Sequence, residues 1–185
     1  MNLKVTIILA VLVMLFGVVS EIWADHIEDS PEVVSLYNKG KRMLREGNWL
    51  EASQIFEELT GRYPQSANID LFIFNRAKAD YYFGDYNKAL TGFGNFSLRF
   101  SQSPYIPYAL FFQGNIYYAR GDVDRAVSLY IRAYARTADR RLEALLEGSL
   151  QGAIANAGSV MLGDDDFAEV PRDKRCSLIQ SVSEV

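Results

Sequence analysis

The sequence is poor in the residues from which most catalytic and metal sites are built. It contains one cysteine, Cys176, and one histidine, His26, among 185 residues. A single cysteine excludes an intramolecular disulfide and every multi-cysteine metal motif. One histidine close to the N-terminus and one thiol in the C-terminal tail do not supply the residues that an acyl-transfer triad or a zinc site needs. We therefore expect no catalytic site, no metal and no cofactor, and we take the chain not to be an enzyme.

Phosphate and calcium loops are missing as well. No Gly-Lys-Ser or Gly-Lys-Thr follows the glycines around Phe93, so there is no phosphate-binding loop. The run Asp164 to Asp166 lacks the alternating spacing of a calcium loop and is interpreted as a solvated linker. The formal charge is −4 and the pI is about 5.1, which disfavours a nucleic-acid surface.

The N-terminal residues resemble an export signal. Lys4 precedes an apolar stretch from Val5 to Val19, shorter than the roughly 20 residues that a membrane-spanning helix needs. Small residues at Ser20 and Ala24 suit signal-peptidase cleavage, so we expect a signal peptide over 1–24 and an exported, periplasmic protein. A permanent anchor is the alternative, and it would be the only contact with the membrane. No cysteine follows the stretch to carry a lipoprotein anchor.

A repeat of 37 residues is the main signal in the rest of the chain, and such periods indicate stacked helical units. The matching columns include glycines, small residues and large aromatic residues: Gly47, Gly84, Gly121; Gly40, Ala77, Gly114; Ala52, Ala89, Ala126; and Phe56, Phe93, Tyr130. The spacing predicts a pair of helices in each unit. The first helices are expected over 32–46, 69–83 and 105–120, the second over 49–62, 86–100 and 123–136, and a capping helix over 140–158.

The turn between the paired helices has its own chemistry. Each repeat glycine is suited to the left-handed residue that ends the first helix. Asn48, Asp85 and Asp122 follow and are expected to cap the second helix. Asn48 with Glu51 also has the spacing of a capping box.

The small residues in the Gly40 and Ala52 columns let the paired helices approach closely. The large ring in the Phe56 column fills the space towards the next unit. We expect Phe93, Tyr117 and Tyr130 in the core. Because no unit buries this face alone, the units must stack.

These columns resemble the tetratricopeptide repeat (TPR) family, whose small, small, aromatic and proline positions correspond here to Gly40, Ala52, Phe56 and Pro64. The resemblance implies an all-α fold, a right-handed superhelical stack of antiparallel helix pairs with three repeats and a C-terminal capping helix. The repeats span about 33–66, 70–103 and 107–138 within a domain over 30–158. The segment from Gly114 to Asp122 is further similar to bacterial envelope TPR proteins of the BamD and CpoB type, which implies an adaptor in cell-envelope assembly.

A protein or peptide partner is expected in the concave groove lined by the first helices. The candidate contacts are aromatic rings for area, asparagines for backbone amides and lysines for a carboxylate: Tyr37, Asn38, Lys41, Phe74, Asn75, Lys78, Tyr81, Phe111, Asn115 and Tyr118. The groove is expected to run from basic at Lys41 to aromatic at Tyr118. Two alternatives remain open. One is that the aromatic rings pack in the inter-repeat core, and the other is that the lysines lie on the solvated surface without contacting a partner.

Other organisations are compatible with the same residues. Docking through the convex face or the capping helix is one alternative to the groove. Two further alternatives are an accessory domain that regulates a cell-wall enzyme and the N-terminal part of a larger envelope protein. Residues 159–185 are expected to form a flexible tail or to begin a further domain.

Overall fold

The computed structural model describes residues 29–157 and 167–183, and this part of the chain folds into eight helices without strands. They are α2 (Pro31–Glu46), α3 (Trp49–Arg62), α4 (Ile69–Phe83), α5 (Tyr86–Arg99), α6 (Ile106–Ala119), α7 (Val123–Arg136), α8 (Arg140–Ala157) and α9 (Arg172–Ser183). The first seven have the bounds expected from the repeat to within about a residue. The export segment and the aspartate run lie outside the described residues.

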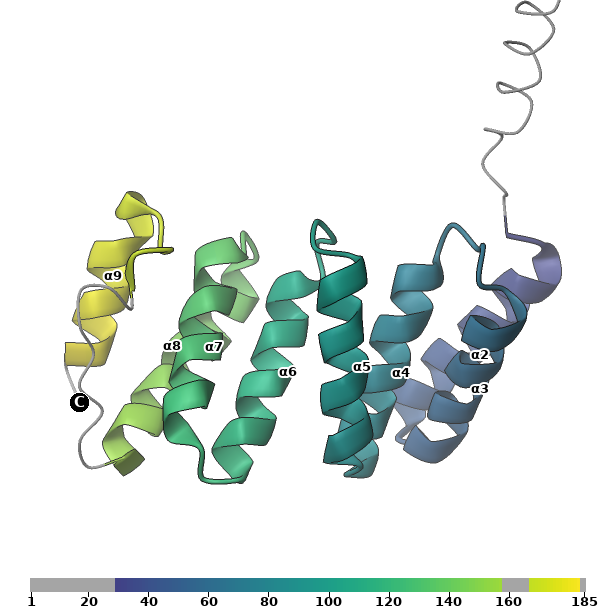
Figure 1. Cartoon of the computed structure of the whole chain (residues 1–185), viewed down its shortest axis with the longest axis horizontal. Helices are drawn as coiled ribbons and strands as arrows, with labels where there is room; N and C mark the ends of the chain where they lie inside the picture. Colours follow the sequence, from purple (N-terminus) through teal and green to yellow (C-terminus); the bar gives the residue numbers. More distant parts are fainter. Residues whose placement is uncertain (1–28, 158–166, 184–185) are drawn as a thin grey trace, which may run out of the picture.

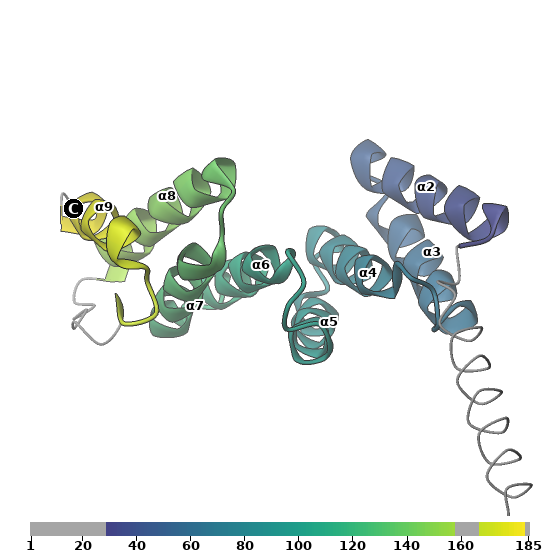
Figure 2. The ribbon, with the colours of Figure 1, turned by 90° about the horizontal axis from the view of Figure 1, so that it is seen from above.

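Consecutive helices pack against each other along the chain, from α2 and α3 to α8 and α9. Figure 1 shows the resulting row of antiparallel helices. Seen from above, α2, α4, α6 and α8 lie along the inner side of an arc, and α3, α5 and α7 lie along its outer side (Figure 2). This is the TPR-like solenoid that the 37-residue register predicts.

The turns inside the repeats form as expected at the glycines. Gly47, Gly84 and Gly121 have φ values of 80°, 92° and 79°, in the left-handed region where a Cβ is costly. Each ends the first helix of a pair and turns the chain into the second.

Two of the three expected caps are present. The carboxylates of Asp85 and Asp122 accept hydrogen bonds from the amides of Lys88 and Arg125, at 3.2 and 3.3 Å. The prediction of a capping box at Asn48 is wrong. Its side chain makes no cap bond and its amide faces the Met43 sulfur instead, while Glu51 pairs with Lys39 at 2.9 Å.

The apolar core consists of two clusters. The smaller lies between α2, α3 and α4 and contains Phe56, Leu59 and Phe72. The larger runs from α4 to α9 and contains Phe93, Phe112 and Tyr130. Phe93 and Tyr130 are thus in the core as expected, whereas Tyr117 is only half-buried, with the Arg125 guanidinium 5.4 Å from its ring centre.

The C-terminal segment corrects the expectation of a flexible tail. Phe167, Val170 and Leu178 are buried in the larger cluster, and α9 packs on α8. The Lys174 ammonium is bonded to the Glu143 carboxylate and to the Thr137 carbonyl. Residues 167–183 therefore extend the stack. Within the described residues, no helix is long and apolar enough to cross a membrane.

Candidate binding groove on the inner face

A pocket of about 320 Å³ opens on the inner side of the arc, where α4, α6 and α8 meet. We call it the inner pocket. Its walls are aromatic and aliphatic, with one cation: Phe74, Lys78, Tyr82, Tyr105, Tyr108, Phe111, Phe112, Leu142 and Leu145. Leu145 is 55% exposed, so an apolar side chain of α8 is already in solvent at the rim. Such a concave, mostly apolar site with few polar groups is typical of a binding site.

The floor of the inner pocket is a rigid aromatic cluster. The Phe112 ring stacks on Phe93 with 5.3 Å between ring centres, and the Phe74 ring packs against Phe93 and Tyr105 at 5.8 and 5.2 Å. Tilted and edge-on ring pairs of this kind fix one another's positions. The walls are therefore ordered before any ligand arrives, which lowers the entropic cost of binding.

Lys78 is the single cation of the inner pocket. Its side chain is half-buried, and burial lowers the pKa of the ammonium below its ordinary value because the charged form loses water. In the described part of the chain no carboxylate forms an ion pair with it. A partly desolvated, unpaired ammonium surrounded by rings favours an incoming carboxylate or carbonyl oxygen.

Tyr108 fixes the α6 side of the pocket. Its hydroxyl donates a hydrogen bond to the Asp139 carboxylate. This bond, with a smaller contribution from burial, raises the pKa of Tyr108 to about 12 and lowers the pKa of Asp139, because it is made to the ionised acid. The link ties α6 to the turn before α8 and holds the pocket wall in place.

The predicted contact residues divide between surface and interior. Lys78 and Phe111 line the inner pocket, and Tyr37 with Lys41 lies further along, on α2. The ammonium of Lys41 is 4.5 Å from the Tyr37 ring centre, and Asn38 is exposed. Phe74 also lines the inner pocket, although it is only 5% exposed, because rings of α5 and α6 pack around it.

Four other predicted contacts are engaged within the fold. The Asn75 amide donates to the Leu71 carbonyl at 2.8 Å, and the Asn115 side-chain oxygen accepts from the Tyr130 hydroxyl at 2.8 Å. The Tyr118 hydroxyl accepts from the Asn156 amide at 2.7 Å, and the Tyr81 ring packs on Phe112. The Asn75 bond lies within α4, whereas the other three side chains connect neighbouring helices and so hold the groove's shape.

The contribution of α8 was not foreseen, although the sequence contains a signal for it. Leu142 and Leu145 follow Tyr105 and Tyr108 by the same 37 residues that separate the repeats. The capping helix therefore occupies the place of a first helix in a fourth unit and lines the groove. Among the residues that the structure describes, no cluster of three or more His, Cys, Asp or Glu side chains is placed to hold a metal.

Comparison with known proteins agrees with this fold. The family described as "YfiO: Outer membrane lipoprotein" matches residues 29–152. Two curated relatives are the outer membrane protein assembly factors BamD of Haemophilus influenzae, 32% identical over 94 residues, and of Xylella fastidiosa, 28% identical over 94 residues. Each match covers 51% of this chain and 36% or 30% of the relative, so the chain spans about a third of their length.

A solved structure extends the comparison to the fold alone. The TPR domain of Sgt2 from Aspergillus fumigatus superposes with a TM-score of 0.54 at 19% identity, covering 75% of this chain and 90% of that domain. The family match covers well over half of the sequence and coincides with the helices that build the groove. This chain therefore belongs to the YfiO family of outer membrane lipoproteins.

Proposed function

We propose that this protein is an adaptor of the bacterial cell envelope that binds a segment of a partner protein in its concave groove during outer membrane assembly. The observation that carries the proposal is the inner pocket, a preformed aromatic hollow with one unpaired lysine. The relatives named as outer membrane protein assembly factors support the setting. Export to the periplasm follows from the expected signal peptide and is part of the same proposal.

The chemistry of the pocket defines the kind of segment that it takes. Rings of α4 and α6 and the leucines of α8 suit one apolar or aromatic side chain. The Lys78 ammonium suits a carboxylate beside it, from an acidic side chain or a chain terminus. A charge-assisted hydrogen bond to a buried partner contributes about 1.5–3 kcal/mol, or roughly a tenfold to hundredfold gain in affinity.

Site-specific photo-crosslinking in intact cells tests the proposal. A photoreactive residue placed at Phe111 or at Leu145 should capture the same envelope protein, since both side chains line the inner pocket. The same reagent at Ser128, which is exposed on the outer helix α7, is the control and should not capture it. Capture from Ser128 alone would show that the partner docks elsewhere.

Substitution of the lysine then tests the chemistry. Lys78→Met keeps the aliphatic stem and removes the charge, so the captured partner should bind the purified protein about tenfold or more weakly. Arg132→Met is the matched control, because Arg132 is an exposed cation on α7 outside the pocket. Equal affinities of the two variants would refute a role for Lys78.

A further inference from the structure

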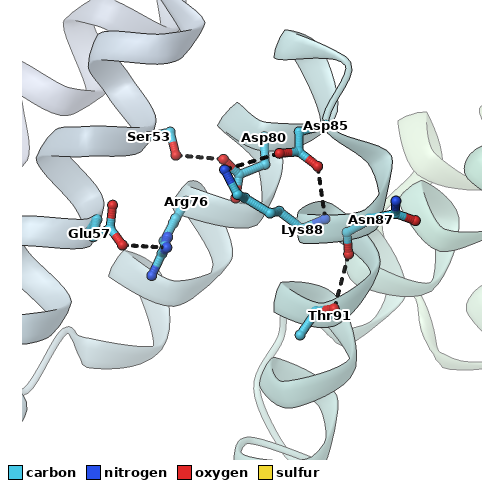
Figure 3. Close-up of polar contacts among 8 residues, drawn as sticks. All are labelled: Ser53, Glu57, Arg76, Asp80, Asp85, Asn87, Lys88 and Thr91. Atoms are coloured by element: carbon cyan, nitrogen blue, oxygen red, sulfur yellow. Dashed lines mark hydrogen bonds and ion pairs between the residues drawn. The ribbon is translucent and has the colours of Figure 1, made fainter.

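A second hollow, of about 400 Å³, lies on the outer side of the arc, between α3 and α5 and above α4. We call it the outer groove. Its floor is formed by Ile73, Ala77 and Gly92, and its walls are polar. Figure 3 shows several of these polar side chains, on α4 and α5, together with Ser53 and Glu57 of α3, which bind Asp80 and Arg76. Figure 2 shows α4, α6 and α8, which line the inner pocket, on the inner side of the arc, and α3 and α5, which flank the outer groove, on its outer side.

Asp80 is the most unusual residue of the outer groove. It lines the hollow yet is only 6% exposed, and the Ser53 hydroxyl donates one hydrogen bond to it at 2.5 Å. A carboxylate accepts several hydrogen bonds, and in the described chain Asp80 forms no ion pair. Burial raises its pKa, since water no longer solvates the charge. Donors from a ligand in the groove would complete its hydrogen bonding.

The other repeats show that this cluster is not a demand of the fold. At the position of Asp80 they carry Met43 and Tyr117, and at the position of Ser53 they carry Leu90 and Val127. Gly92 corresponds to Ile55 and Leu129, which are large and apolar.

Packing accounts for Gly92 itself, because a Cβ there would lie 2.8 Å from the Ala77 Cβ. Packing does not account for a buried acid and hydroxyl, because Leu90 and Tyr117 occupy the same two positions at the next junction without a charge. A buried acid that lines a cleft and has a perturbed pKa is therefore a candidate for a functional site.

The wall of the outer groove on α5 is a polar stripe with a cation at each end, formed by Lys88, Thr91, Asn95 and Arg99. Between Tyr86 and Arg99, α5 carries no acidic residue. Lys88 is paired with Asp85 at 3.1 Å, and Arg76, from α4, is paired with Glu57 at 2.7 Å (Figure 3). Arg99 forms no ion pair within the described residues. The stripe therefore presents an unpaired cation at Arg99 and, at its other end, the Lys88 ammonium, whose charge Asp85 already partly neutralises.

We propose that the outer groove binds an extended, acidic segment of a partner protein, with carboxylates at Lys88 and Arg99 and a backbone N–H at Asp80. The two cations are eleven residues apart on one helix, or about 16 Å. An extended chain covers that distance in about five residues at ~3.3 Å each. This makes the solenoid a two-sided adaptor, and the outer site is independent of the proposed function of the inner pocket.

A blocked hexapeptide tests the outer groove directly. Acetyl-Gly-Glu-Gly-Ser-Gly-Glu-amide has two carboxylates on the same face of an extended chain, about 13 Å apart at ~3.3 Å per residue. The long side chains of Lys88 and Arg99 cover the remaining distance, and the blocked peptide has no free terminus for the inner pocket. We expect it to shift the backbone amide resonances of Asp80, Thr91 and Asn95 on titration into the full chain. The glutamine version of the peptide should bind at least tenfold more weakly. No binding of the acidic peptide at about 1 mM, or equal binding of both peptides, would overturn the proposal.

Matched substitutions locate the site. Lys88→Ala with Arg99→Ala should weaken peptide binding at least tenfold, and Asn95→Trp, at an exposed position, should block the groove to a similar extent. Arg125→Ala with Arg136→Ala removes the cations at the same positions one repeat later and should leave affinity unchanged.

Lys78→Met should also leave the affinity for the hexapeptide unchanged, which separates this result from the inner pocket. If the Arg125 and Arg136 substitutions weakened peptide binding as much as the Lys88 and Arg99 substitutions, the peptide would be responding to net charge alone. The proposal would then fail. Circular dichroism confirms that each variant remains folded.

Discussion

At Gly114 the missing side chain makes room for the ring of Tyr130. A Cβ built on Gly114 would lie 2.5 Å from Cε1 of Tyr130, and that ring is buried and tied by its hydroxyl to Asn115. Because neither the ring nor the α6 backbone has space to move, Gly114→Ala should lower the free energy of unfolding by about 1–3 kcal/mol. Urea denaturation followed by circular dichroism measures the change.

Gly94→Ala is the matched control. Gly94 is also inside a helix, but a Cβ there meets nothing within 4 Å. Alanine should therefore raise the free energy of unfolding by about 0.5–1 kcal/mol through helix propensity. A similar loss at both glycines would mean that helix packing is not what selects glycine at Gly114.

The Asp80 carboxylate makes stability depend on pH. Burial raises the pKa of Asp80 in the folded protein, so its ionisation costs stability as pH rises from the unfolded value near 3.8 through the folded pKa. Asp80→Asn removes that charge and retains an oxygen to accept from Ser53. The variant should be more stable than the wild type at pH 7, and the difference should shrink as pH falls towards 4.

Urea denaturation of both proteins at several pH values measures this difference. Glu46→Gln, which removes an exposed carboxylate at the end of α2, controls for a general effect of net charge. A difference between Asp80→Asn and wild type that does not vary with pH would contradict the assignment to Asp80.

At the scale of single residues, the repeat pattern predicted some contacts and not others. The repeat register identified the close approach at Gly114, because only a column of small residues opposite a column of rings explains it. The same register placed Phe74 in the groove beside Tyr37 and Phe111. Burial of Phe74 depends on Phe93 of its own repeat and on Phe112 of the next, and a pattern read within one repeat does not contain the second contact.

Helix bounds were predictable because the turns have strong local chemistry. A left-handed glycine followed by an N-capping acid stops one helix and starts another at a defined residue. Helix α9 has no such repeat signal, and its position depends on surfaces far away in the chain. Leu178 is buried, and the Lys174 ammonium is bonded to Glu143. Local sequence patterns do not report contacts of this kind.

Leu178→Ala tests whether α9 is part of the stack. Leu178 is 0% exposed in the larger core cluster, so truncation should cost about 2–5 kcal/mol. The loss should appear as a lower free energy of unfolding, or as faster amide exchange confined to α9 if that helix detaches first. Its neighbour Ile179 is 41% exposed, and Ile179→Ala should change stability by less than about 1 kcal/mol. Equal effects would indicate an undocked helix.

For the whole molecule, the sequence predicted the concave groove. It did not predict that α8 lines that groove, and it did not predict the outer groove. The inner pocket needs Leu142 and Leu145 of α8, which become groove residues only because α8 stacks as a fourth first helix. The outer groove needs Ser53 and Asp80 to meet across two repeats. Both sites arise from the junctions between units, so a solenoid acquires binding chemistry where one repeat departs from the others.

The division of the core into two clusters predicts how the molecule opens. In a stack of repeats each unit is stabilised mainly by its neighbours, so damage to one unit spreads only as far as the shared core. Phe72, on α4, belongs to the smaller cluster and Phe112 to the larger cluster, and both rings are buried. Phe72→Ala and Phe112→Ala remove the same group and should each cost about 3–5 kcal/mol locally.

Native-state hydrogen exchange separates their effects. Phe72→Ala should speed exchange in α2 and α3 and leave α6 and α7 near wild-type rates, because the larger cluster stays intact. Phe112→Ala should speed exchange from α4 to α8. If both substitutions accelerated every helix alike, the two clusters would unfold as one unit, and the polar contact of Ser53 with Asp80 would couple the repeats as strongly as an apolar core does.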